Sequence, residues 1–165
     1  MKPQEKKYRV SSFDPIRGLL HHKHAPIIKT VDSTHYYGEH SGNDVEKFVE
    51  YPDRYEIHIL KEHNGMFTLT EHARIPDKHA GFSWLKKKGY SKANIVSMHY
   101  TEYSYKNGTI GLYTINKILL SVILYYLQTD IDIIEHELGL QNCEIISVPY
   151  NIYVKRLKCD VSIQL

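Results

Sequence analysis

The chain has 165 residues, of which 42% are hydrophobic and 24% are charged, a composition typical of one globular domain spanning residues 1–165. A net charge of +2 gives no whole-molecule field that would favour nucleic acid or a membrane, so neither is expected as a partner. The first ten residues lack the apolar stretch of a signal peptide, and the longest apolar run, 118–127, is too short to span a bilayer. A cytoplasmic location is therefore expected.

The first half of the chain predicts a strand, a helix and then three strands. Asp14-Pro15 begins the helix, and turn residues at Pro52-Asp53 and Asn64-Gly65 separate the three strands. In order, the predicted ranges are 5–10, 13–24, 44–50, 55–61 and 67–75. The polar and aromatic residues at 35–40 are assigned to a loop or a strand end, where they could form a polar pocket.

The second half predicts a helix over 78–88 that ends at Gly89, followed by a hairpin over 95–115. Alternating apolar and polar residues on both arms and the turn Lys106-Asn107-Gly108 indicate the hairpin. After it, an apolar strand at 119–127 precedes a helix that Thr129 or Asp130 caps and Gly139 closes. Residues 150–157 predict a short helix or strand.

These segments sum to roughly eight strands, mostly joined in antiparallel fashion, with two or three helices. The fold class is therefore α+β, and the strand count is sufficient to close a barrel. The two cysteines, Cys143 and Cys159, fit no metal-binding spacing; free thiols are favoured, and a disulfide stays open. No P-loop, G-x-S-x-G or H-E-x-x-H motif is present.

In their order, the segments QEKKYRV, PDKHAGFSWLKKKGY, IVSMHYTEYSYKNGTIGLYTI and LGLQNCEIISVPYNIYVKRL resemble the CYTH family. That family comprises class IV adenylyl cyclases, thiamine triphosphatases and related triphosphate tunnel proteins. The resemblance covers about residues 4–157. It implies an eight-stranded antiparallel barrel with helices packed outside. It also implies basic residues in the bore that hold a triphosphate and carboxylates that hold Mg²⁺ or Mn²⁺.

Carried over residue by residue, the family's E-x-E-x-K strand retains Glu5 and Lys7, whereas Pro3 replaces its first glutamate. Arg9 lies on the same face of the strand. Later strands offer further candidates. The resemblance thus predicts ligand-binding roles for Lys7, Arg9, Lys47, Lys61, His72 and Arg74, and metal-binding roles for Glu5 and, after a one-residue slip, Glu71.

Other expected carboxylates are missing from the sequence. The acidic position after the hairpin falls on Tyr113, and the late Glu-x-Glu pair falls on Ile123-Leu124-Tyr125. Without those oxygens the family's two-metal site cannot assemble. Mg²⁺ or Mn²⁺ is therefore compatible with the chain but not required.

Three functions follow from this pattern. The first is a module that binds a phosphorylated small molecule or nucleotide, of triphosphate type, without the full metal-dependent catalysis. The second is an active metal-dependent triphosphatase or adenylyl cyclase that uses Glu5, Glu56 or Glu71. The third is a scaffold for protein–protein interaction: the strand at 119–127 is apolar on both faces and needs a helix or a second subunit of a homodimer to cover it.

Overall fold

The computed structural model describes all 165 residues. Its elements, in chain order, are β1 (Gln4–Val10), α1 (Asp14–His22), β2 (Ile27–Gly38), β3 (Val45–Glu50), β4 (Tyr55–His63), β5 (Met66–Ile75), α2 (Lys78–Lys87), β6 (Lys92–Tyr105), β7 (Gly108–Ile115), β8 (Leu119–Tyr126), α3 (Gln128–Glu137), β9 (Glu144–Ile145), α4 (Tyr150–Arg156) and β10 (Val161–Gln164).

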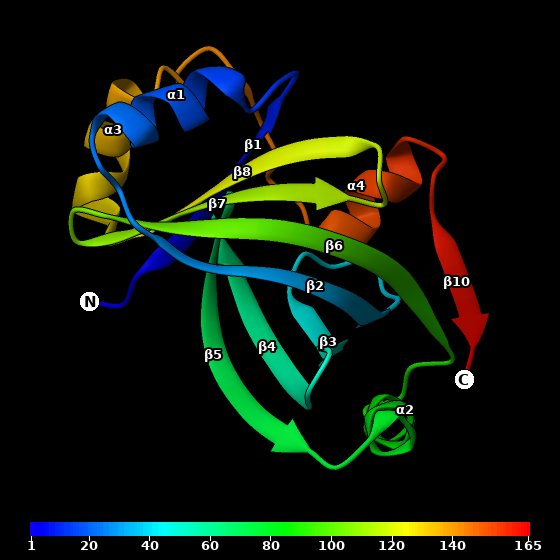
Figure 1. Cartoon of the computed structure of the whole chain (residues 1–165). Helices are drawn as coiled ribbons and strands as arrows, with labels where there is room; N and C mark the ends of the chain where they lie inside the picture. The colour runs from blue at the N-terminus through cyan, green and yellow to red at the C-terminus, as the bar shows by residue number, and fades with distance from the viewer.

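Eight strands form a closed antiparallel barrel (Figure 1). They follow one another around the ring as β6-β2-β3-β4-β5-β1-β8-β7, and pairing between β7 and β6 closes it. Strand β10 extends the sheet from the first residues of β6, and β9 pairs with the end of β1. The predicted α+β barrel with helices packed outside is confirmed.

The barrel has its shortest strand pairing between β1 and β5, which share a single residue pair, Glu5 with Phe67. Where β5 diverges, β9 takes its place beside β1, and the amide of Ile146 donates to the carbonyl of Lys7. At the start of α4, Asn151 then hydrogen-bonds Asn94 of β6 at 2.9 Å. The segment that leads into α4 therefore crosses from β1 to β6 and covers one end of the barrel interior.

Strand β8 is apolar on both faces because each face contacts a different core. Ile123 belongs to the cluster inside the barrel, whereas Val122 and Leu124 belong to a second cluster outside it. Side chains of α1 and α3, including Leu20 and Ile131, complete the outer cluster. Helices of the same chain thus cover this strand, one of the two coverings that the sequence allows.

Helix α2 packs against β3 at a point where only glycine fits. A methyl group at Gly81 would lie 2.6 Å from the ring of Phe48, well inside van der Waals contact. Asp77 precedes the helix with extended backbone, and its carboxylate accepts the amide of Ala80 at 2.8 Å. This is a side-chain N-cap of the usual kind.

Residues 35–38, expected in a loop or at a strand end, form the end of strand β2, whose first part, 27–34, the sequence pattern does not predict; β2 pairs with β6 through most of its length. One prediction of local structure is wrong. The third helix has neither Thr129 nor Asp130 as its cap: its N-cap is Leu127, without a side-chain hydrogen bond. The sequence pattern also does not predict β9 and β10, while residues 150–156 form the helical alternative.

Both cysteines are free thiols, which is the alternative that the sequence favours. None of the helices combines the length and the hydropathy that crossing a bilayer would need.

Candidate functional site

A cavity of about 290 Å³ lies inside the barrel. Every second residue of the surrounding strands faces it, so charged groups reach the interior from several elements. Its charged lining consists of Glu5, Lys7, Lys29, Lys47 and Glu102. Its aromatic polar lining consists of Tyr37, Tyr51, Tyr100, Tyr113, Tyr125 and Tyr150. The interior is therefore both charged and rich in flat rings.

Lys7 of β1 is the most enclosed cation of the cavity, with an exposed fraction of 4%. Its ammonium donates to the carbonyl of Val148 at 2.8 Å and lies 4.0 Å from the ring centre of Phe67 and 4.4 Å from that of Tyr150. Burial lowers the pKa of Lys7 to about 7, and the nearby carboxylate of Glu5 offsets only part of that effect. The ammonium is therefore only partly charged at neutral pH.

Lys47 of β3 approaches the same cavity from the other side of the ring. Its ammonium donates to the hydroxyl of Tyr37 at 3.4 Å, and burial lowers its pKa to about 8 against the attraction of Glu5. Burial likewise raises the pKa of Glu5, and the two lysines Lys47 and Lys7 oppose that rise. The single carboxylate of Glu5 therefore lies near two buried ammonium groups, those of Lys7 and Lys47, and can neutralise only one of them.

Glu102 of β6 is a cavity carboxylate that the sequence pattern does not identify. It pairs with Lys29 of β2 across an N–O distance of 3.7 Å, and the side chain of Lys29 is half-exposed. The pairing of these strands places the two groups together, since Lys29 lies opposite Glu102 in the register. Predicting this contact requires β2, which the sequence pattern misses.

A wider mouth of about 820 Å³ adjoins the cavity and shares Tyr51 and Met98 with it. Basic groups at this mouth include Arg54, Arg74 and Lys117. Acidic groups also line it, so the mouth carries both signs of charge. A ligand longer than the inner cavity could extend in this direction.

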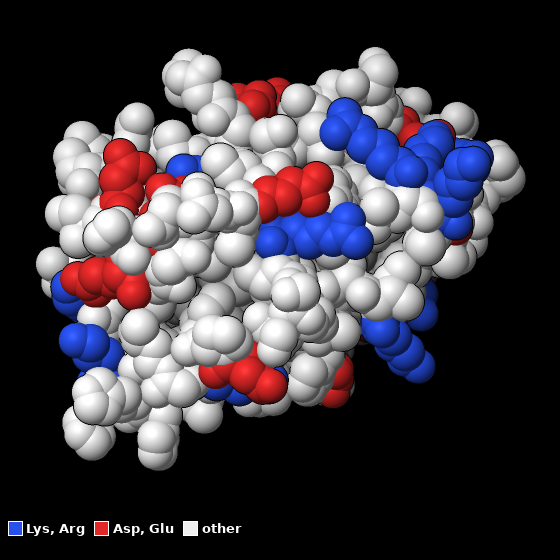
Figure 2. All heavy atoms as spheres, turned by 90° about the horizontal axis from the view of Figure 1, so that it is seen from above, with Lys and Arg blue, Asp and Glu red and all other residues white.

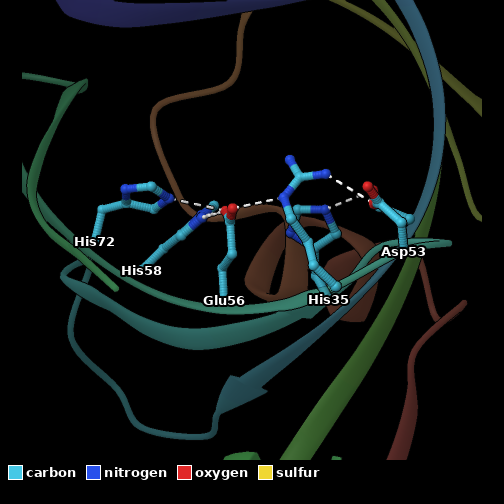
Figure 3. A network of polar contacts seen from close by, with 7 residues as sticks. His35, Asp53, Glu56, His58 and His72 are labelled. Carbon is cyan, nitrogen blue, oxygen red and sulfur yellow. Dashed lines mark hydrogen bonds and ion pairs between the residues drawn. The ribbon is translucent and has the colours of Figure 1, made fainter. Parts of the chain in front are cut away.

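At the wall of the cavity, which His58 lines, two histidines converge on one carboxylate (Figure 3). The Nε2 atoms of His58 and His72 lie 3.0 Å and 2.9 Å from the same oxygen, Oε2 of Glu56. The other oxygen of Glu56 accepts the Nε–H of Arg54 at 2.7 Å, and Arg54 also pairs with Asp53 at 2.9 Å. The ligand atoms of the two histidines and Glu56 all lie within 4.8 Å of one another, so this group could hold a metal ion.

The electrostatics of this group follow from its contacts. Burial alone would raise the pKa of Glu56, but the hydrogen bonds from Arg54, His58 and His72 outweigh it and lower the pKa to about 2. For His58, burial and the charge of Lys47 lower the pKa to about 4 despite the carboxylate. Glu56 is therefore ionised and His58 neutral at pH 7.

The structure brings three of the predicted site residues together: Glu5, Lys7 and Lys47 line the inner cavity. Two more lie close by, since His72 contacts Glu56 and Arg74 lines the mouth.

The remaining three predicted residues, Arg9, Lys61 and Glu71, line neither the cavity nor its mouth. Arg9 contacts Tyr153 at 3.2 Å near the far end of β1. Lys61 is exposed and pairs with Asp44 at 3.2 Å, because Leu60 takes the inward position on β4. The prediction that Lys61 lies in the barrel interior with Lys7 is therefore wrong.

Glu71 points away from the cavity because of a register shift in the β4–β5 hairpin. Leu60 pairs with Leu69, but the next pair is Ile59 with Glu71, so one extra residue of β5 is inserted. Without that bulge Glu71 would lie opposite His58; with it, His72 does. The bulge therefore exchanges a carboxylate for an imidazole beside the cavity.

The positions at which the family resemblance predicts carboxylates, and this sequence has other residues, face the cavity. Tyr113, Ile123 and Tyr125 line it, and its only carboxylates are Glu5 and Glu102. A site for two divalent metal ions needs more oxygen ligands than these two groups supply. The residues of the bore therefore do not fit the metal site that the fold implies.

On the face that Figure 2 shows, both acidic and basic side chains lie among uncharged ones. The candidate site consists of the barrel interior and its mouth.

A scan against models of protein families and a search of curated protein sequences found no match. Solved structures do match. The PH1012 protein from Pyrococcus horikoshii OT3 superposes with a TM-score of 0.77 at 16% identity, over 90% of this chain and 96% of that one. A conserved protein from Pyrococcus furiosus gives a TM-score of 0.77 at 12% identity, over 90% and 97%.

A third match, from Vibrio parahaemolyticus, is a protein provisionally assigned as an adenylate cyclase. It gives a TM-score of 0.63 at 12% identity, and the match covers 87% of this chain and 90% of that one. At such low identity these likenesses establish the fold alone. The chain therefore shares the fold of these proteins, and its antiparallel barrel with helices outside is the fold that the order of its sequence segments predicts.

Proposed function

We propose that the barrel interior binds a phosphorylated small molecule or nucleotide, of triphosphate type, without the metal-dependent catalysis of the family. The observation that carries this proposal is the convergence of Lys7, Lys29 and Lys47 on one cavity in which Glu5 and Glu102 are the only acids. The excess of basic groups in an enclosed, low-dielectric space attracts a compact polyanion more strongly than any exposed group could.

The state of the two buried lysines supports an anion rather than a neutral ligand. Burial lowers the pKa of Lys7 to about 7 and that of Lys47 to about 8, because no sufficient negative charge accompanies them. A phosphate chain between them would supply that charge and raise both pKa values. Binding at pH 8 should therefore take up about one proton, which ordinary surface binding would not do.

The aromatic lining adds a reason for a nucleotide. Tyr100 and Tyr113 stack with their ring centres 4.4 Å apart at the cavity wall. Tyr51, which lines both the cavity and the wider mouth, would offer a nucleobase at the mouth a further ring, since flat rings prefer offset stacking. The phosphates would then lie in the inner cavity and the base toward the mouth.

The test is isothermal titration calorimetry with inorganic tripolyphosphate at pH 8, in EDTA and in two buffers of different ionisation enthalpy. We expect binding with uptake of about one proton. Lys47→Met should weaken it by at least tenfold, whereas Lys61→Met, which removes an exposed lysine paired with Asp44, should not change it. Absence of binding by tripolyphosphate and ATP, or equal binding by Lys47→Met, would refute the proposal.

A metal-dependent triphosphatase or cyclase is the second candidate, because Glu5 and Glu102 do provide two carboxylates to the same cavity. Release of phosphate or pyrophosphate from ATP with Mg²⁺ or Mn²⁺, abolished by Glu5→Gln, would favour it. A homodimer and a scaffold role remain predictions, which sedimentation with and without tripolyphosphate would address.

A further inference from the structure

The group formed by Glu56, His58 and His72 includes none of the lysines of the proposed anion site, although His58 also lines the cavity that holds them. Glu56 and His58 are alternate residues of β4, so they project from the same face of the strand. His72 of β5 lies directly opposite His58 in the register. Three side chains from two adjacent, hydrogen-bonded strands thus meet at one point on a rigid part of the barrel.

We propose that Glu56, His58 and His72 bind a divalent transition-metal ion of the zinc class. Two imidazole nitrogens aim at one carboxylate oxygen, at 3.0 Å and 2.9 Å, as Figure 3 shows. Two imidazoles and one carboxylate form a donor set that suits Zn²⁺, Fe²⁺ or Mn²⁺, whereas Mg²⁺ and Ca²⁺ prefer oxygen ligands throughout.

The distances are compatible with such an ion. Tetrahedral zinc with bonds of about 2.1 Å separates its ligand atoms by about 3.4 Å. The observed oxygen–nitrogen separations are shorter than that by about 0.4 to 0.5 Å, and all three ligand atoms lie within 4.8 Å of one another. Three protein ligands would leave a fourth position for water or another oxygen ligand.

The surroundings also orient the carboxylate. Arg54 binds Oε1 of Glu56 and leaves Oε2 for the ion, an arrangement typical of the outer shell of a metal site. The positive charge of Arg54 opposes a cation, but Arg54 pairs with Asp53 and its guanidinium lies 4.1 Å from the ring centre of Tyr51, which holds it in place. Asp53, Arg54 and Glu56 together carry a net charge of −1.

Burial within the group is graded, which gives an ion a path of entry. The side chain of Glu56 is 7% exposed and that of His58 is 14% exposed, whereas half of the His72 side chain is accessible. His72 can therefore swing out to admit an ion and close on it. The same gradient makes His72 the ligand that can be replaced with least effect on folding.

The test uses the whole chain without phosphate. Zn²⁺ titration by calorimetry should give one site, and Co²⁺ should develop the visible absorption of a low-coordinate ion. His72→Gln and Glu56→Gln should each weaken binding at least tenfold. A matched control is His99→Gln, because His99 also pairs with a carboxylate, Asp32 at 2.8 Å, but has no third ligand.

Further controls separate this site from others. Lys47→Met should retain metal binding, so that failure of the anion site and failure of the metal site can be told apart. The exposed histidines His21, His22 and His24 remain in every variant and contribute the same background. Equal Zn²⁺ affinity in wild type and His72→Gln, with both folded by circular dichroism, would overturn the proposal. A Co²⁺ spectrum of the fully hydrated ion would overturn it too.

Discussion

The partly neutral state of Lys7 predicts how the stability of the protein changes with pH. In the unfolded chain this lysine has its usual pKa of 10.5, whereas burial lowers it to about 7 in the folded chain. Between these values the unfolded state binds more protons than the folded state. Stability should therefore rise as the pH increases from 7, and Lys7→Met should remove that contribution.

The magnitude follows from the two pKa values. From pH 7 to pH 9, the unfolded chain holds on average nearly one proton more than the folded chain at this residue. At about 1.36 kcal/mol per proton and pH unit, Lys7 should raise the free energy of unfolding by about 2 kcal/mol, and Lys47, whose pKa is lowered to about 8, should add about 1 kcal/mol over the same range. The hydrogen bond from Lys7 to Val148, which the substitution also removes, shifts stability without changing this slope.

Urea unfolding at pH 7, 8 and 9, followed by circular dichroism, measures the slope. The matched control is Lys61→Met, which removes a lysine with a 59% exposed side chain and should keep the wild-type slope. If Lys7→Met kept the full wild-type slope, and not only the part that Lys47 contributes, the ammonium of Lys7 would have to be fully charged in the interior. The reasoning about an unpaired buried cation would then be wrong.

Three further substitutions test the packing of the fold by chemical or thermal unfolding. Asp77→Ala removes the cap of α2 and should cost about 1 kcal/mol, and Asp77→Asn should restore most of it. Gly81→Ala forces a methyl group against the ring of Phe48 and should cost about 1 to 3 kcal/mol; a neutral outcome would mean that α2 can move away from β3. Tyr126→Phe leaves a buried backbone carbonyl without its donor at 2.7 Å and should cost about 1 to 3 kcal/mol, in contrast to Tyr103→Phe at a half-buried position.

The barrel could be predicted because its strands carry local signals. Alternation, turn residues and the order of segments identify seven of its eight strands, and alternation also places Glu5 and Lys7 on one face. Strand β2 is the exception. Its first half is mostly exposed and its second half is buried on both faces, so it shows no regular alternation, and long-range pairing with β6 determines its structure.

The site could be predicted only where alternation alone decides which way a side chain points. Lys47 faces inward as its place on the strand suggests, whereas the inward position on β4 belongs to Leu60 and not to Lys61. The contact of Glu56 with His72 depends on a one-residue bulge in the partner strand. A bulge changes the register of all residue pairs beyond it in the hairpin. The turn residues Asn64-Gly65 give no sequence signal that predicts this bulge.

The single residue pair between β1 and β5 has a consequence for the order in which the protein can fold. Strand β1 leaves the ribosome first, yet its partners β8 and β9 are synthesised more than a hundred residues later. Until then its hydrogen-bonding edges have almost nothing to pair with, and such distant contacts slow folding. Completion of the ring must therefore wait for β8, so a nascent chain interrupted before residue 119 would carry the acidic and basic groups of the bore on an open sheet.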